Sequence, residues 1–371
     1  MTDRLIRPSI AALRPYVPGK PIEEVERELG LTNLVKLASN ENCLGPSPRA
    51  VEAVRAAAPA AWLYPDAACF ALKRSLSEFH ALPPDHFTLG TGSDEILHLI
   101  SLAFFNPGDE VAFGDPSFVV YESAAALMGC VPVKVPLRAF THDLAAMRTA
   151  ITERTKCVFI ANPNNPTGTM NTADEVERFL DGLPEHVIVV MDEAYHEYVE
   201  RIDYPLTLRY VREGRNVVVL RTFSKIYALA GLRVGYGMAR PELSKWLNAV
   251  REPFNVNSLA QVAAIASLHD AEQVTRTRAM NSAGKAWLYR KLERLGLPFV
   301  PTEANFLLIE VGRDSNAVFQ ALLRKGVIVR TGDLFGLPTY IRVTIGTEDM
   351  NRRFIHALEL ALGEVTEGTI A

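Results

Sequence analysis

From about Arg49 to Thr222 the sequence alternates between short apolar runs and longer segments with helical patterning. The apolar runs have the character of buried strands, and they span residues 86–89, 110–113, 131–135, 157–161, 187–191 and 216–220. Strands that alternate with helices form a mainly parallel sheet with helices on both faces, so an α/β fold is predicted. Ligands of such sheets bind beyond the carboxyl ends of the strands, and the residues that follow each strand are therefore the first candidates for a site.

Three of these strands run directly into polar motifs. Residues 157–161 lead into Asn-Pro-Asn-Asn-Pro-Thr-Gly, which contains Asn165, and residues 187–191 end at Asp192 with Tyr195 close behind. Residues 216–220 lead into Arg-Thr-Phe-Ser-Lys, which ends at Lys225, and a Gly-Leu-Arg turn follows with Arg233. We expect an amide, a carboxylate, a hydroxyl, an amine and a guanidinium to meet at one edge of the sheet.

This set of groups matches the needs of pyridoxal phosphate. A lysine amine such as Lys225 can form a Schiff base with an aldehyde cofactor. A carboxylate such as Asp192 keeps the pyridine nitrogen protonated, and the amide of Asn165 and the hydroxyl of Tyr195 can donate to the phenolic oxygen. Each residue also has an ordinary reading, since Asp192 can cap a helix and Asn165 can serve its turn. The whole set in this order favours the cofactor.

The cofactor phosphate needs backbone donors and positive charge. The sequence Gly-Ser-Asp-Glu at 92–95 begins a predicted helix after a strand, so the N–H groups of Ser93, Asp94 and Glu95 are expected to face an anion. An ordinary helix cap is the alternative. Ser224 offers a hydroxyl, Arg233 offers a guanidinium that can bind phosphate with two hydrogen bonds, and the ring of Phe118 is the candidate for stacking on the pyridine.

The chain is expected to have three parts. Residues 1–45 form an N-terminal arm that joins the small domain, residues 46–252 form the large cofactor-binding domain, and residues 253–371 form a smaller α+β domain. The last part contains expected helices at 256–269, 272–295 and 349–361, and expected strands at 305–309, 327–330 and 340–345.

Composition excludes several classes of protein. The 371 residues are 48% hydrophobic and 22% charged, as in globular proteins with a large core, and the net charge of −4 does not favour nucleic acid or a membrane surface. The four cysteines form no CxxC pair, so reduced thiols and no metal site are expected. No secretory signal and no membrane-spanning run are visible, and a cytoplasmic enzyme is expected.

The motifs around these residues resemble those of fold-type I pyridoxal-phosphate aminotransferases. Asn-Pro-Asn-Asn-Pro-Thr-Gly, Asp-Glu-Ala-Tyr, Thr-Phe-Ser-Lys and Gly-Leu-Arg-Val-Gly-Tyr carry this resemblance. Within that superfamily, Arg14-Pro15-Tyr16, the Asn-Glu-Asn of residues 40–42 and Tyr64-Pro65-Asp66 are similar to motifs of the histidinol-phosphate aminotransferases. The resemblance covers nearly the whole chain, from about Leu13 to Ala361.

The resemblance implies further roles and a reaction. Lys225 would move the proton between the substrate carbon and the cofactor, Thr222 would join the cofactor site, and Tyr64 would reach the cofactor phosphate of a neighbouring subunit in a homodimer. Arg342 would bind the substrate α-carboxylate, and Tyr16, Asn42 and Arg330 would lie near the variable end of the substrate. The reaction implied is the exchange of the amino group between L-histidinol phosphate and 2-oxoglutarate, giving imidazole-acetol phosphate and L-glutamate.

Three other functions stay open at this stage. An aromatic amino-acid aminotransferase keeps the fold and changes the substrate. A pyridoxal-phosphate decarboxylase acting on threonine phosphate changes the bond that is broken. A non-enzymatic regulator with an aminotransferase-like domain would need a basic DNA-binding segment, and the sequence shows none.

Overall fold

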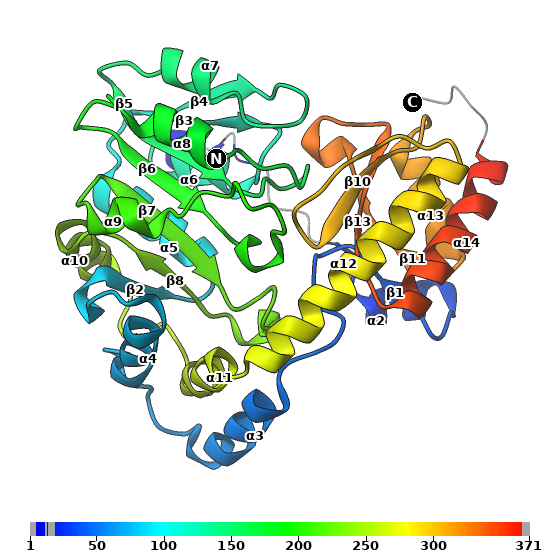
Figure 1. The fold of residues 1–371 in the computed structure, drawn as a ribbon, viewed down its shortest axis with the longest axis horizontal. Helices are drawn as coiled ribbons and strands as arrows, with labels where there is room; N and C mark the ends of the chain where they lie inside the picture. Colours follow the sequence, from blue (N-terminus) through cyan, green and yellow to red (C-terminus); the bar gives the residue numbers. More distant parts are fainter. Residues whose placement is uncertain (1–4, 12, 14–18, 366–371) are drawn as a thin grey trace.

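The computed structural model describes residues 5–11, 13 and 19–365, and a seven-stranded sheet forms the centre of its larger unit (Figure 1). In spatial order the strands are β2 (Phe87–Gly90), β8 (Gly235–Met238), β7 (Val217–Thr222), β6 (Ile188–Asp192), β5 (Thr155–Ala161), β3 (Glu110–Asp115) and β4 (Val131–Pro136). All neighbouring pairs are parallel except the two made by β8. The predicted α/β fold with a mainly parallel sheet is confirmed.

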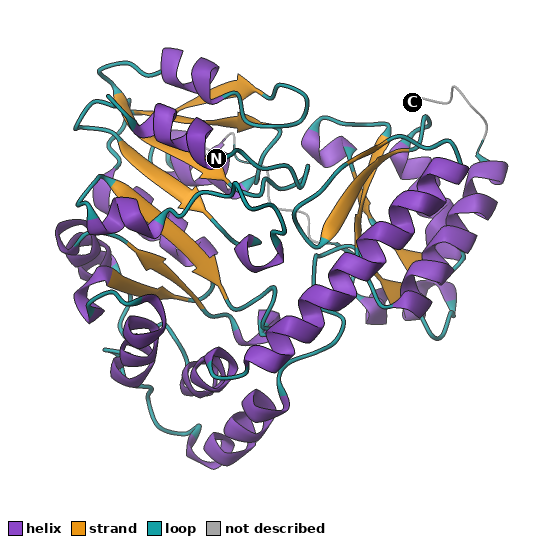
Figure 2. Cartoon of the chain, in the orientation of Figure 1, coloured by secondary structure: helices purple, strands orange, loops and turns teal. Residues whose placement is uncertain are grey.

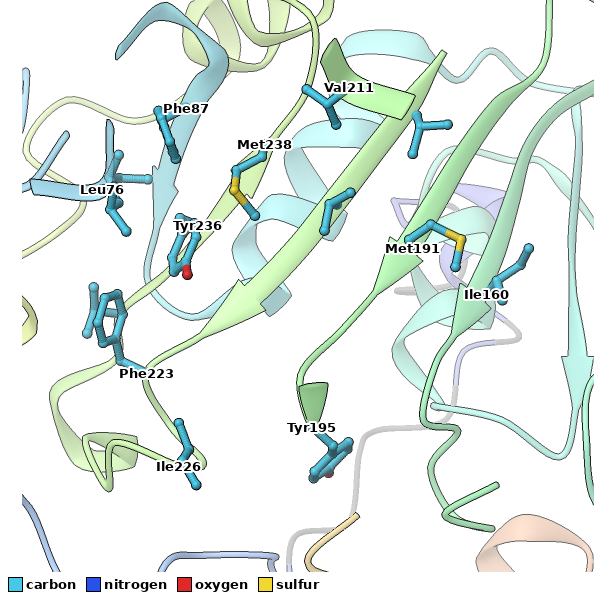
Figure 3. Close-up of a cluster of buried hydrophobic side chains, with 14 of the residues drawn as sticks. Leu76, Phe87, Ile160, Met191, Tyr195, Val211, Phe223, Ile226, Tyr236 and Met238 are labelled. Atoms are coloured by element: carbon cyan, nitrogen blue, oxygen red, sulfur yellow. The ribbon is translucent and has the colours of Figure 1, made fainter. Parts of the chain in front are cut away.

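Both faces of this sheet are buried. In β5, Val158 and Ile160 belong to one hydrophobic cluster, whereas Cys157 and Phe159 belong to the cluster on the opposite face. The first cluster, part of which Figure 3 shows, also receives side chains from α3 (Pro48–Ala57), α4 (Phe70–His80), α7 (Leu144–Thr149), α8 (Ala173–Leu180), α9 (Leu208–Arg212) and α11 (Ser258–Leu268). The second receives side chains from α5 (Ser93–Phe104), α6 (Val120–Leu127) and α10 (Pro241–Val250).

A smaller α+β unit lies beside the large one (Figure 2). Its antiparallel sheet has the order β12 (Arg330–Thr331), β13 (Tyr340–Thr344), β10 (Phe306–Glu310) and β9 (Phe299–Val300). Helices α13 (Ser315–Arg324) and α14 (Glu348–Glu364) pack on it. The long helix α12 (Ala271–Arg294) joins the two units, since Val274 packs on the large core while Leu288 and Leu292 belong to the small one.

The segment from Val35 to Asn42 belongs to the small unit although it lies near the start of the chain. Its strand β1 (Val35–Lys36) pairs in parallel with β11 (Val327–Ile328), and the preceding helix α2 (Ile22–Leu29) packs there too. Beyond β1, Thr344 N donates to Leu37 O at 2.8 Å. The segment then runs along the edge of the large unit.

The remaining elements are short, namely α1 (Pro8–Ala11) and the 3-10 turns η2 (Ala58–Ala60), η3 (Pro84–His86), η4 (His196–Tyr198), η5 (Ala230–Leu232) and η6 (Asp333–Phe335). The expected strand at 327–330 is two separate strands, β11 and β12, which belong to different sheets. In the described part of the chain, no helix is both long and apolar enough to cross a membrane.

Candidate active site

A cavity of about 270 Å³ lies where β5, β6 and β7 end and α5 begins. The small unit closes one side of it with Arg330 and Arg342. Twelve of the residues predicted from the sequence line this cavity: Ser93, Asp94, Phe118, Asn165, Asp192, Tyr195, Thr222, Ser224, Lys225, Arg233, Arg330 and Arg342. The structure thus gathers residues that are up to 249 positions apart in the sequence, from Ser93 to Arg342, around one space.

Lys225 follows the end of β7 and reaches into the cavity. Its Nζ donates to Ser39 O at 3.3 Å and lies 5.6 Å from the centre of the Tyr195 ring. Among the described residues no carboxylate lies within ion-pair distance of this amine. An amine with only one weak contact can be captured by a ligand without breaking the fold.

Asp192 is the last residue of β6, and its carboxylate is buried in the cavity wall. Tyr121 donates its hydroxyl to Asp192 Oδ2 at 2.7 Å, and Ala194 N donates to Oδ1 at 3.2 Å. Burial raises the pKa of Asp192 to about 6, although the Tyr121 hydrogen bond opposes that rise. These contacts with described residues supply hydrogen bonds but no cation, so a positively charged ligand group beside this carboxylate would be strongly favoured.

Asn165 is oriented by an arginine of the small unit. Arg342 lies on β13, and its Nη1 donates to Asn165 Oδ1 at 2.6 Å while its Nη2 donates to Ala38 O at 2.8 Å. Because the amide oxygen of Asn165 is engaged, the Nδ2 hydrogens are the groups that it can offer to a ligand.

Tyr195 lies beyond the end of β6 (Figure 3), and two neighbouring side chains hold it. Its ring packs edge-on against Phe306 at 5.1 Å, and its hydroxyl accepts a hydrogen bond from Asn40 Nδ2 at 2.9 Å. The hydroxyl is therefore fixed in place at the cavity wall and still has its own proton to donate.

The beginning of α5 is suited to an anion. Gly92 is the N-cap, with φ +81°, and no side chain caps the helix there, so the backbone N–H groups that follow are available. A Cβ on Gly92 would lie 2.7 Å from Arg233 Nη2, which means that glycine leaves room for the guanidinium beside the helix start. The hydroxyls of Thr222 and Ser224, 3.0 Å apart, line the same cavity.

A buried ion pair behind the cavity ties β6 to β7. Glu193 is fully buried, and it accepts hydrogen bonds from Nε and Nη2 of Arg221, both at 2.9 Å, and one from Thr207 Oγ1. Glu193 N also donates to Leu220 O at 2.9 Å. Since Asp192 precedes Glu193 and Lys225 follows Arg221, this pair holds the two strand ends that carry them.

The charge of the cavity is positive on balance. Lys225, Arg233, Arg330 and Arg342 line it, against three acids, Glu41, Asp94 and Asp192. Glu41 is paired with Lys36 at 2.7 Å, and Asp94 lies 3.7 Å from Arg233 Nη2. The arrangement therefore suits ligands with more than one anionic group, such as a phosphate together with a carboxylate.

Three predicted site residues do not line the cavity, and a fourth lies outside the described residues. Asn42 does not line the cavity, contrary to expectation, because its Nδ2 donates to Ile226 O at 2.8 Å and to Thr277 Oγ1 at 3.2 Å. Glu95 is not among the lining residues, and its side chain accepts hydrogen bonds from Thr91 and Asn255 at the turn before α5. The prediction concerned the backbone N–H of Glu95, and these side-chain contacts do not test it. Tyr64 is 83% exposed and stacks on Phe254 away from this cavity. Tyr16 lies outside the described residues.

Among the lining residues that the sequence reasoning missed, Tyr121 and Asn40 matter most, because their side chains bond to Asp192 and Tyr195. Tyr121 comes three residues after Phe118, and its backbone N donates to Phe118 O at 3.1 Å. Because Phe118 was expected beside the cofactor, this spacing could have predicted that Tyr121 also lines the cavity. Asn40 belongs to the Asn-Glu-Asn motif of residues 40–42. Its hydrogen bond to Tyr195 joins segments 155 positions apart, and no local pattern predicts that contact.

These residues fit pyridoxal phosphate. The buried Asp192 carboxylate lacks a cation, which a protonated ring nitrogen would supply, and the uncapped start of α5 with Arg233 offers a place for a phosphate. Lys225 provides the amine for an aldehyde, and Phe118, which packs on Tyr121 at 5.7 Å between ring centres, lines the wall. The donors therefore match the cofactor group by group.

Comparisons with known proteins agree with this reading. The model of the family "Aminotransferase class I and II" matches residues 32–358. A histidinol-phosphate aminotransferase of Moorella thermoacetica is 56% identical over 353 residues, 95% of this chain and 92% of that protein. One of Symbiobacterium thermophilum is 49% identical, covering 97% of this chain and 99% of that protein.

Solved structures show the same fold. The histidinol-phosphate aminotransferase of Sinorhizobium meliloti, in complex with pyridoxal-5'-phosphate, has a TM-score of 0.90 at 28% identity and covers 97% of this chain and 98% of that one. An aspartate aminotransferase from Thermus thermophilus with maleate has a TM-score of 0.83 at 24% identity, covers 96% of this chain and 99% of that one, and supports the fold alone.

Proposed function

The chain belongs to the class I and II aminotransferases, and we propose that it exchanges the amino group between L-histidinol phosphate and 2-oxoglutarate. The products are imidazole-acetol phosphate and L-glutamate, and the step belongs to histidine biosynthesis. The cofactor is pyridoxal 5'-phosphate. The observation that carries the proposal is one cavity that combines a reactive amine, a buried carboxylate and three arginines, in a chain 56% identical to a relative of that name.

We assign the cofactor-binding roles as follows. Lys225 would hold the aldehyde group, Asp192 would keep a proton on the ring nitrogen, and Asn165 and Tyr195 would donate to the phenolic oxygen. The start of α5 at Ser93 and Asp94, the hydroxyls of Thr222 and Ser224, and the guanidinium of Arg233 bind the phosphate, while Phe118 packs on the ring. When bound, the cofactor supplies a carbonyl that takes up the amino group and a ring that withdraws electrons from the substrate carbon.

The chain's own residues do the remaining work. Lys225 moves the proton between the α-carbon of the substrate and the cofactor. This role suits an amine that forms no ion pair with a described carboxylate. Arg342 binds the α-carboxylate of glutamate, and it is already oriented by Asn165 and by Ala38 O. Arg330, buried at the far side of the cavity, binds the phosphate of histidinol phosphate.

We also propose that the protein is a homodimer that works in the cytoplasm. A patch of exposed large apolar side chains is available for a second copy, and it comprises Trp62, Leu63, Tyr64, Phe70 and Phe254. Tyr64 would then reach the cofactor phosphate of the partner subunit.

The test is the absorbance spectrum of the purified protein before and after addition of single amino donors. We expect a band of lysine-bound cofactor that disappears with micromolar L-histidinol phosphate and, at higher concentration, with L-glutamate. A far stronger response to L-phenylalanine would assign the protein to the aromatic aminotransferases, and release of CO₂ from threonine phosphate would assign it to the decarboxylases. No cofactor band after addition of pyridoxal phosphate would refute the role of Lys225.

A further inference from the structure

We infer that Asn40 is a positioning residue that forces the Tyr195 hydroxyl to donate its proton into the cavity. The inference rests on the proposed function, because the acceptor in the cavity would be the phenolic oxygen of the cofactor. It concerns Asn40 itself, a residue buried to 1% exposure that reaches Tyr195 from another part of the chain.

Two residues of the small unit hold the backbone of Asn40. Its backbone N donates to Thr344 Oγ1 at 3.0 Å, and its backbone O accepts from Asn305 Nδ2 at 3.1 Å. Its own φ is +56°, a left-handed conformation that asparagine tolerates better than most residues. The side chain therefore leaves a fixed backbone and has little freedom to move.

Thr344 determines which end of the Asn40 amide faces Tyr195. The Thr344 hydroxyl accepts from Asn40 N, and its proton points to Asn40 Oδ1 at 3.4 Å. The reversed amide would give this hydroxyl two donors and leave its proton without that acceptor. The observed arrangement therefore presents Nδ2, a pure donor, to the Tyr195 oxygen at 2.9 Å.

The direction of this hydrogen bond decides what Tyr195 can do. A phenol that accepts from Asn40 must send its single proton elsewhere, and none of the described residues accepts a hydrogen bond from it. Tyr195 lines the cavity, so its proton is directed there. Removing or reversing the Asn40 donor would allow the hydroxyl to turn away from the cofactor.

The experiment is a pH titration of the absorbance band of the lysine-bound cofactor. A donor on the phenolic oxygen stabilises negative charge there and makes the neighbouring protonated nitrogen easier to deprotonate. The variants are N40G, which removes the side chain and suits the left-handed backbone, and N40D, whose carboxylate would accept the Tyr195 proton. The midpoint of the pH titration should rise in the order wild type, N40G, N40D. The loss of one hydrogen bond in N40G should raise it by roughly half to one pH unit.

Two controls separate positioning from structural or charge effects. N33G changes another left-handed asparagine, with φ +60°, that is exposed and bonded to Arg353 instead, and it should leave the midpoint unchanged. In a Y195F background, N40G should no longer move the midpoint, because no hydroxyl remains to be directed. Lys225, Asp192 and Arg342 face the same cavity and are identical in all variants, so their influence cancels.

The outcomes are distinct. A midpoint that N40G and N40D leave at the wild-type value, with melting temperatures that show folded proteins, would overturn the inference and leave the proposed function intact. The inference would also be overturned if N40G shifted the midpoint of the titration equally in the wild-type and the Y195F backgrounds. Absence of the cofactor band in the wild-type protein would overturn both the inference and the function on which it rests.

Discussion

At the scale of single residues, Lys225 is the group on which turnover should depend most directly. Lys225→Ala should abolish amino transfer and the absorbance band of lysine-bound cofactor, because no other amine lines the cavity in the described part of the chain. The melting temperature of the cofactor-free variant should stay within about 2 °C of wild type, since the amine makes one long hydrogen bond, to Ser39 O. Absorbance and scanning calorimetry measure both effects, and persistent amino transfer would contradict the assignment.

His142 provides a pH-dependent contribution to stability. It is buried, its Nε2 bonds to Ala161 O at 3.1 Å, and a Cβ on Gly114 would lie 2.1 Å from its Nδ1, so the ring packs directly on the sheet. Burial lowers the pKa of His142 to about 4, from 6.5. The unfolded chain therefore binds the proton more tightly, and the contribution is present above pH 6.5 and is lost as the pH falls towards 4.

The size of this effect can be measured against His142→Gln. Relative to that variant, the cofactor-free wild-type protein should lose about 2 kcal/mol of unfolding free energy between pH 8 and pH 5. Urea titrations at several pH values give the comparison. The buried His80 and the half-buried His196, whose pKa values burial also lowers, cancel because both proteins contain them. Parallel curves for the two proteins over this range would show that His142 is protonated without cost.

Single residues were predictable where they follow a strand. Asp192, Asn165 and Lys225 come after apolar runs whose parallel arrangement can be predicted, so their meeting at one edge follows from the topology. Asn40 and Tyr121 carry no such signal, because their partners are defined by side-chain contacts between distant segments. Asn42 was expected near the substrate, but its amide is used in holding the segment against Ile226 and Thr277.

At the scale of elements, the closest backbone approach beside the cavity is between β8 and the start of α5. A Cβ on Gly235 would lie 2.5 Å from Ser93 N and 2.7 Å from Gly92 C. Gly235→Ala should therefore displace the start of α5 and weaken cofactor binding about tenfold or more, with some loss of stability. Equilibrium dialysis of the cofactor tests this, with Gly363→Ala as a control at an open position without a left-handed backbone. An unchanged dissociation constant would mean that the turn can relax freely.

β8 was also the main strand that the sequence did not reveal. Gly-Tyr-Gly-Met is short and has two glycines, which weaken any strand pattern, and it forms a strand because β2 and β7 pair with it on both sides. The helices α4, α9, α10 and α13 were not predicted either. Long elements such as α12 were placed within a residue or two, since their length carries the pattern.

At the scale of the whole molecule, the exposed aromatic patch predicts a dimer. Trp62 is 82% exposed and Tyr64 is 83% exposed, far more than such side chains usually are in a monomer. Trp62→Asp should convert the dimer to a monomer, as measured by sedimentation velocity at micromolar concentration. It should also weaken cofactor retention, because Tyr64 could no longer reach the cofactor phosphate in the partner subunit. Ile202→Asp, at a fully exposed position elsewhere, is the matched control. A wild-type protein that sediments as a monomer would contradict the dimer.

The division of the chain into units is also visible at this scale. A boundary after residue 252 was expected, but α11 packs on α3 and α4 of the large unit, and only the second half of α12 enters the small core. We propose that the boundary lies within α12. Composition could not reveal this, because a helix of the large unit and a helix of the small unit have the same pattern.

The placement of the segment from Val35 to Asn42 sets the order in which the protein can be completed during synthesis. Asn40 leaves the ribosome early, whereas Thr344, to which it is bonded, is 304 positions later. At about 5–20 residues per second, that interval lasts about 15 to 60 s. All strands of the large sheet, and Tyr195 with them, are synthesised before Thr344. Asn40 therefore cannot be held in its final position until β13, which contains Thr344, has been made.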